Sequence, residues 1–151
     1  MRYHATLVGA TTCVLLLCFL SLSACTTLTP QEEAQVQANA NRKITCTKGS
    51  DCDVKWGRAI TWISRNSQWK IQTQSDYLIQ TYTAVGGSAA SSFLVNKVPL
   101  DSDTFEIVMT SGCDNLIGCI PDATMLRAAF NNFVIGPAPA AKVLPVADVQ
   151  P

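Results

Sequence analysis

Residues 53–83 read DVKWGRAITWISRNSQWKIQTQSDYLIQTYT, and the hydrophobic period of this stretch changes once, from that of a helix to that of a strand. As far as Asn66, apolar residues recur at intervals of three and four, which places them on one helix face. They are Trp56, Ala59, Ile60 and Ile63. Ser50 or Asp51 can cap the start of this helix. The stretch therefore predicts a helix that is followed directly by sheet.

The rest of the stretch alternates between apolar and polar side chains, which is the pattern of half-buried strands. In residues 68–74 the inward side chains are expected to be Trp69, Ile71 and Thr73, and in residues 77–83 they are Tyr77, Ile79 and Thr81. The link Ser75-Asp76 has the residue types of a tight turn. These two strands are therefore expected to pair antiparallel.

Further along the chain the pattern predicts two more strands and a second helix. A loop at residues 86–88 precedes a strand over 93–98, and a turn at 100–103 precedes another over 104–110. Residues 121–134 have a helical stripe, with Pro121 suited to the first turn and Gly136-Pro137 to the stop. The stripe consists of Leu126, Ala129, Phe130 and Phe133. We expect this helix to cover a sheet face lined by Ile71, Ile79 and Ile107, with Phe130 fully buried.

The order of these elements predicts an α+β fold with an antiparallel sheet of about four strands, covered by two helices in two layers. We expect this single domain to span residues 44–136. Residues 25–43 are polar and lack aromatic side chains, which favours a flexible tether. Residues 137–151 are rich in proline and alanine, which favours a disordered tail.

The N-terminus has the three parts of an export signal. Arg2 supplies the positive charge, and the apolar run over 11–22 is shorter than the ~20 residues that a spanning helix needs. The following residues Leu22-Ser23-Ala24-Cys25 resemble the lipobox of bacterial lipoprotein signals. This resemblance implies that residues 1–24 are removed and that lipid on Cys25 anchors the chain. Thr26, where an aspartate would imply retention in the inner membrane, suggests the outer membrane, with the domain on the periplasmic side.

Four of the seven cysteines remain once Cys13 and Cys18 leave with the signal and Cys25 is lipidated. They form two units of the spacing C-x₅-C, which is too wide for the usual zinc motifs. An even number of cysteines in an exported chain indicates disulfides. Three connectivities are possible, and the repeated spacing favours Cys46–Cys52 and Cys113–Cys119.

Composition excludes several functions. With eleven basic and eleven acidic residues, the chain has no basic stripe for nucleic acid. The only histidine, His4, lies in the signal, so histidine catalysis and ligation are excluded from the mature chain. Carboxylate pairs at 51/53 and 101/103 match no calcium loop and are typical of caps and turns. We therefore expect no catalytic residue, no metal and no cofactor.

Trp62 lies off the main stripe of its helix. It either edges the core or is exposed as a contact residue, because exposed aromatic side chains are favoured anchors in interfaces. It is the only contact residue that the sequence suggests.

Residues 46–136 resemble a group of small proteobacterial lipoproteins of unknown function, in runs such as CDVKW at 52–56, WISRNS at 62–67 and GCDN at 112–115. We expect a non-enzymatic, membrane-anchored envelope lipoprotein that binds another envelope protein or a cell-wall component. The alternatives are an inhibitor of lysozyme-type attackers and a carboxylate-based hydrolase. The sequence does not determine the oligomeric state.

The lipobox makes a direct prediction about Cys25→Ser. Without the sulfur that accepts lipid, this variant should lose lipid labelling and accumulate as uncleaved precursor or as soluble protein. Metabolic labelling with a fatty acid and membrane fractionation measure both effects. A variant that matures and fractionates like the unmodified protein would contradict the lipoprotein interpretation.

Overall fold

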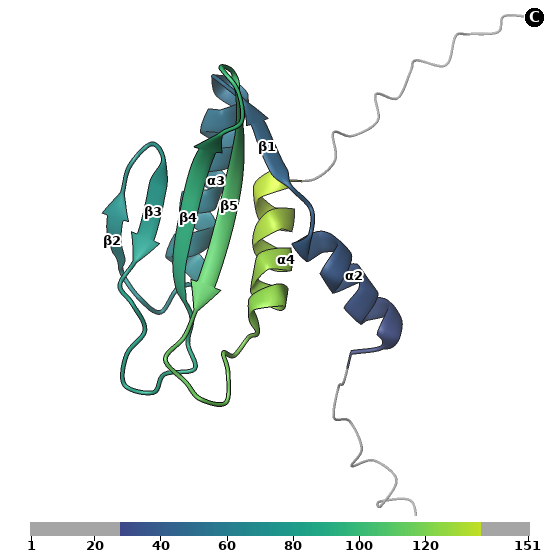
Figure 1. Ribbon diagram of the computed structural model, residues 1–151, viewed down its shortest axis with the longest axis vertical. Coiled ribbons are helices and arrows are strands. Elements are labelled where there is room, and N and C mark those ends of the chain that lie inside the picture. The colour runs from purple at the N-terminus through teal and green to yellow at the C-terminus, as the bar shows by residue number, and fades with distance from the viewer. Residues whose placement is uncertain (1–27, 137–151) are drawn as a thin grey trace, which may run out of the picture.

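The computed structural model describes residues 28–136 (Figure 1). The predicted signal, Cys25 and the predicted tail lie outside the described residues. Three helices and five strands follow one another: α2 (Pro30–Ala40), β1 (Ile44–Thr47), α3 (Ser50–Asn66), β2 (Ile71–Gln74), β3 (Leu78–Thr81), β4 (Ser92–Pro99), β5 (Thr104–Gly112) and α4 (Ala123–Ile135). Within this part of the chain, no helix combines the length and the apolar character needed to cross a membrane.

The strands form one antiparallel sheet in the order β1-β5-β4-β3-β2, so the α+β class with an antiparallel sheet is as predicted. Within residues 28–136 the sheet has five strands where about four were expected, and three helices are present where two were expected. The additional strand, β1, lies directly after the polar segment that was assigned to the tether, and its four residues alternate between buried and exposed.

The additional helix, α2, occupies part of the segment that was expected to be a flexible tether. Thr29 and Glu32 form a capping box at its start: the Thr29 hydroxyl accepts from the Glu32 amide, and the Glu32 carboxylate accepts from the Thr29 amide at 2.7 Å. The bond from the Thr29 amide, and then a second bond that the Thr29 hydroxyl donates to the same carboxylate at 2.8 Å, keep the pKa of the exposed Glu32 carboxyl below its usual value. Because α2 has almost no apolar face of its own, its packing against α4 could not be predicted from periodicity.

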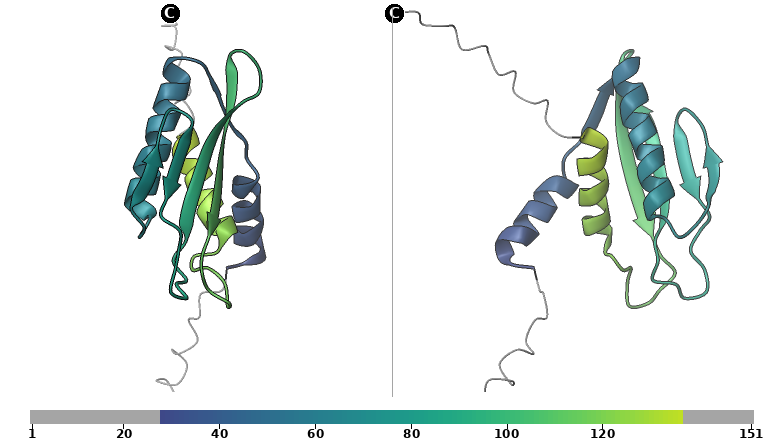
Figure 2. Two further views of the ribbon diagram at one scale, coloured as in Figure 1. Left: turned by 60° about the vertical axis from the view of Figure 1, so that its left-hand side comes forward. Right: turned by 180° about the vertical axis from the view of Figure 1, so that it is seen from behind.

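Helices α3 and α4 lie side by side on one face of the sheet, and α2 lies beyond α4 (Figure 2). We expected α4 alone to cover the sheet face lined by Ile71, Ile79 and Ile107, but the two helices share this face. Helix α3 lies between α4 and the β2–β3 pair, which carries Ile71 and Ile79. Ile107 in β5 lies on the α4 side. Fifteen buried side chains form the core, among them Ile44, Ile63, Ile79, Val95, Ile107, Phe130 and Val134.

Two of the four stripe positions predicted for α4 are wrong. Leu126 and Phe130 are buried as expected, whereas Ala129 and Phe133 are exposed. The buried arc instead continues through Val134 and, towards α2, through Ala128 and Asn131. The physical reason is that α4 is covered on two sides, by the sheet and by α2, which rotates its buried face away from positions 129 and 133.

Trp62 belongs to the core, and the idea that it is an exposed contact residue is wrong. Its ring meets Phe93 of β4 and Phe130 of α4 edge to face, with centroids 5.5 and 5.4 Å apart. Such pairs add to the stabilisation that comes from burial. Trp62 is buried although it lies off the α3 stripe, because α4 covers the side of α3 that would otherwise be exposed.

The disulfides Cys46–Cys52 and Cys113–Cys119 are present, which is the pairing that the repeated spacing favours. The first joins β1 to the first turn of α3, and the second closes the loop between β5 and α4. Beside the first, the Asp51 carboxylate accepts hydrogen bonds from the Lys55 ammonium at 3.1 Å and from the Thr47 amide at 3.0 Å. These two bonds, that from Lys55 first, lower the pKa of Asp51.

Phe130 and Phe133 provide a matched test of the corrected α4 face. Phe130→Ala should lower the free energy of unfolding by ~3–5 kcal/mol, the usual range for a core phenylalanine, because Phe130 is fully buried against Trp62. Phe133→Ala, one turn later and 39% exposed, should cost much less. Thermal and denaturant unfolding measure both. Equal effects of the two substitutions would contradict the assigned face.

Candidate functional site

Strand β5 has an unpaired edge over half of its length. Strand β4 pairs with it from Phe105 to Gly112, whereas β1 pairs with it only from Thr104 to Ile107. Residues 108–112 therefore have a sheet neighbour on one side only. An unpaired edge presents backbone amide and carbonyl groups that can hydrogen-bond to another chain.

Two hydrogen bonds define which backbone groups point to the open side. The Lys48 amide donates to the Asp103 carbonyl at 2.7 Å, and the Leu100 amide donates to the Thr104 carbonyl at 2.8 Å. Backbone groups alternate in direction along an antiparallel strand. Odd-numbered residues of β5 therefore point towards β1 and even-numbered residues towards β4. Beyond Ile107, the groups that point to this side are those of Met109, which is buried at 3% exposed, and those of Ser111, which is half-buried.

A buried amide, that of Asn131, ends the pairing of β1. Its Nδ2 lies 3.0, 3.0 and 2.9 Å from the carbonyl oxygens of Asn39, Ala40 and Arg42. Since Ile44 lies opposite Ile107, a longer β1 would place Arg42 opposite Met109. The Arg42 carbonyl instead accepts from Asn131, so the chain turns away from β5 and towards α4.

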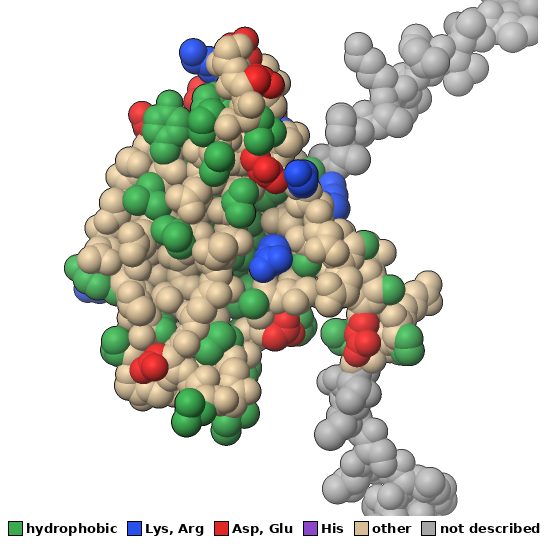
Figure 3. Space-filling view, in the orientation of Figure 1, with side chains coloured by type: hydrophobic (Ala, Val, Ile, Leu, Met, Phe, Trp, Pro, Cys, Tyr) green, Lys and Arg blue, Asp and Glu red, His purple; other side chains and the backbone are tan. Residues whose placement is uncertain are grey.

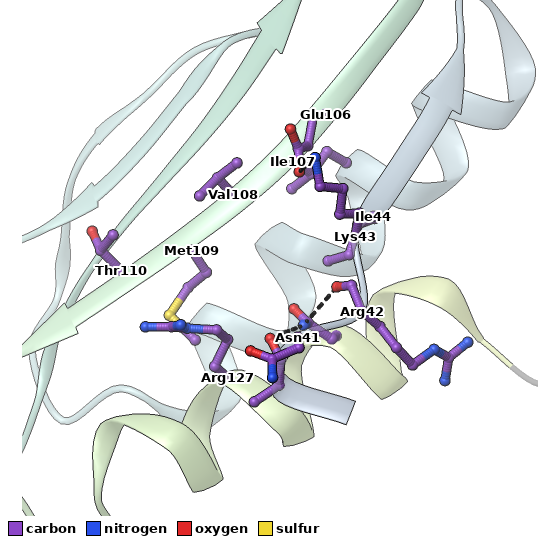
Figure 4. A pocket seen from close by; sticks show the side chains of 12 residues that line it. Asn41, Arg42, Lys43, Ile44, Glu106, Ile107, Val108, Met109, Thr110 and Arg127 are labelled. Carbon is purple, nitrogen blue, oxygen red and sulfur yellow. Dashed lines mark hydrogen bonds and ion pairs between the residues drawn. The ribbon is translucent and has the colours of Figure 1, made fainter. Parts of the chain in front are cut away.

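This divergence opens a groove of about 310 Å³, which we call the edge groove. Residues 40–44 form one wall and residues 106–110 the other (Figure 4), and Arg127 and Asn131 of α4 complete the lining. Its volume is at the lower end of the range for ligand sites in proteins.

The edge groove is lined by three cationic side chains and one anionic side chain. Lys43 lies 4.0 Å from the half-buried Glu106, a long ion pair with an exposed lysine that contributes little. Arg42 points away and donates to the Asn132 side-chain oxygen at 3.2 Å. Arg127 extends from α4 towards β5 and makes no hydrogen bond or ion pair with the described residues. Lys and Arg side chains are also visible along the border between the sheet and α2 (Figure 3).

The carboxylate pairs singled out in the sequence lie outside the edge groove. The Asp101 carboxylate accepts from the Asp103 and Thr104 amides at 2.9 and 2.7 Å, which lowers its pKa and identifies it as a turn residue. Asp51 bonds to the start of α3 as described above. Among residues 28–136, no three His, Cys, Asp or Glu side chains converge as a metal site would require. Glu106 is the one carboxylate among the residues that line the groove.

Neither Trp62 nor the disulfides contribute to the edge groove, and sequence reasoning missed Arg127, Asn131 and the free edge. One feature of the sequence could have indicated Asn131: it is a polar residue next to Phe130 in the apolar face of a helix. A buried amide is costly unless it is hydrogen-bonded, so such a position indicates a specific partner. The partner itself, the end of α2, became visible only in the tertiary structure.

Asn131→Leu tests the hydrogen bonds that hold the wall of the edge groove. Three carbonyl groups lose their shared donor, so we expect a loss of ~1–3 kcal/mol of stability and faster hydrogen exchange across residues 30–43. Exchange measured by mass spectrometry and thermal unfolding report both. Asn132→Leu removes only the exposed bond to Arg42 and serves as the control. Unchanged exchange in the Asn131 variant would contradict the role of this side chain.

Comparison with protein-family models, with curated proteins and with solved structures finds no match to this chain.

Proposed function

We propose that this protein is a non-enzymatic lipoprotein of the bacterial outer membrane that binds an extended segment of another envelope protein in the edge groove. The lipobox that ends at Cys25 supports the anchoring, and the absence of an aspartate after it supports the outer membrane. The two disulfides agree with an oxidising compartment such as the periplasm.

The observation that carries the proposal is the free edge of β5. An extended segment laid along residues 108–112 can exchange hydrogen bonds with the half-buried Ser111 and so continue the sheet where β1 leaves it. At ~3.4 Å per residue, this edge accommodates about five residues of a strand. Main-chain hydrogen bonds give affinity in this mode of recognition, and pockets for alternate side chains give specificity.

The charges of the groove indicate an acidic segment. The guanidinium group of Arg127 lies at the groove without a partner among the described residues, and its planar fork matches a carboxylate in a bidentate arrangement. Lys43 adds a second positive charge nearby. The preferred ligand is therefore a strand with an aspartate, a glutamate or a C-terminal carboxylate facing α4.

A carboxylate-based hydrolase finds no support in the edge groove. Such an enzyme places two carboxyl groups about its substrate. Glu106 is the single carboxylate in the lining, and it faces Lys43. The groove therefore has the composition of a binding site.

Selection of peptides from a random displayed library, with the full mature chain as bait, tests the proposal. We expect the selected peptides to be extended, to have an acidic residue and to bind more weakly at high salt. Arg127→Gln should weaken a selected peptide by about tenfold, because hydrogen bonds to charged groups are worth ~1.5–3 kcal/mol. Ser111→Pro removes an edge donor without touching the β4 ladder and should also weaken it.

Arg65→Gln, in the last turn of α3, is the matched control and should bind the peptide normally. Calorimetric titration measures each affinity, and thermal unfolding verifies that each variant is folded. Selected peptides that bind equally well to the Arg127 and Ser111 variants would show that the edge groove is not the binding site.

A further inference from the structure

Large apolar side chains are exposed at one end of the molecule, on the two loops that follow β3 and β5. Leu116 and Ile117 are fully exposed, at 107% and 98%, and Ile120 is 75% exposed. Val85, on the loop after β3, is 61% exposed. We call Leu116, Ile117 and Ile120 the apolar tip. Exposed apolar clusters of this kind mark interaction sites in soluble domains.

The apolar tip is held in a defined conformation. The Cys113–Cys119 disulfide closes its loop, and the Asn115 side chain connects it to the neighbouring loop by donating to the Gly87 carbonyl at 2.7 Å. The Gly87 amide in turn donates a hydrogen bond to the Asp114 carboxylate at 3.1 Å. Because these bonds order the backbone in advance, a partner that covers the tip does not have to order it.

The apolar tip lies at the end of the molecule where the described chain begins. Leu28 lines a groove of about 430 Å³ together with Asp122 and Met125, so the start of α2 lies beside the start of α4. Asp122 caps α4 and follows Ile120 by two residues. Figure 1 shows the start of α2 and both loops at the lower end of the view, and Figure 3 shows apolar side chains exposed there.

The chain length between Leu28 and the proposed lipid is short. Cys25 precedes Leu28 by three residues. At no more than ~3.6 Å per residue, Cys25 lies within about 11 Å of Leu28. A membrane that held a lipid on Cys25 would therefore lie near the end of the domain that carries the apolar tip.

We propose that the apolar tip inserts into the interface of the bilayer to which the lipid on Cys25 anchors the chain. This inference rests on the proposed anchoring.

Residues 82–91 and 113–122 contain two acidic residues, Asp114 and Asp122, and no lysine or arginine. The tip therefore fits a bilayer with zwitterionic headgroups, because anionic lipids attract basic segments. A second contact beside a lipid anchor fixes the orientation of the domain on the membrane, since the lipid keeps the tip at a high effective concentration.

Fluorescence quenching in vesicles tests this contact. Ile117→Trp is made in the mature lipidated protein, which is reconstituted into phosphatidylcholine vesicles whose acyl chains carry bromine at known depth. We expect the introduced indole to emit at shorter wavelength and to be quenched by bromine near the headgroups. Signal from the three native tryptophans is subtracted with the unsubstituted protein, in which Trp56 and Trp62 are buried.

Leu100→Trp is the matched control, because Leu100 is also exposed and lies in the turn between β4 and β5, at the opposite end of that hairpin. Its indole should remain unquenched. Protein that floats with the vesicles but shows no quenching at position 117 would overturn the bilayer contact while leaving the lipid anchor intact. Protein that does not float would overturn both the anchoring and this inference.

Discussion

The Asn131 side chain joins the parts of this molecule that matter for function. Its amide binds the three carbonyl groups at the end of α2, and through them it holds α2 on α4 and turns residues 39–42 away from β5. Two consequences follow from one polar group. The edge of β5 remains open, and the start of α2 lies beside the start of α4. Buried amides of this kind specify a single arrangement because any other leaves polar groups unsatisfied.

Helix α4 relates the proposed binding site to the proposed membrane contact. Its cap, Asp122, follows the disulfide-closed loop that carries the apolar tip, and Arg127 lies one turn further along at the edge groove. A domain whose apolar end rests on the bilayer would thus present the groove at a fixed height above the membrane surface. Such an arrangement suits a protein that holds an extended segment of a neighbour close to the membrane.

The main contribution of the disulfides is to fix the position of the segments that lead into α3 and α4. Each closes a short loop, which in the chain-entropy model is worth only ~2.4 kcal/mol. Cys46–Cys52 sets the angle between β1 and α3, where Asp51 adds bonds to Thr47 and Lys55. Cys113–Cys119 sets the entry into α4 and shapes the loop that exposes Leu116 and Ile117. Both loops precede helices that pack on the same face of the sheet.

Local periodicity was sufficient to predict α3, the succession of strands β2 to β5, the α+β class and the burial of Phe130, because each depends on side chains close together in the chain. The spacing of the cysteines was likewise sufficient to favour the observed pairing. Helix α2, the burial of Trp62 and the exposure of Ala129 and Phe133 were decided by tertiary structure alone. Each depends on α2 or α4 covering a surface that the sequence pattern leaves open. The edge groove belongs to this second group, since it exists only because Asn131 reaches residues some 90 positions earlier in the chain and draws them away from β5.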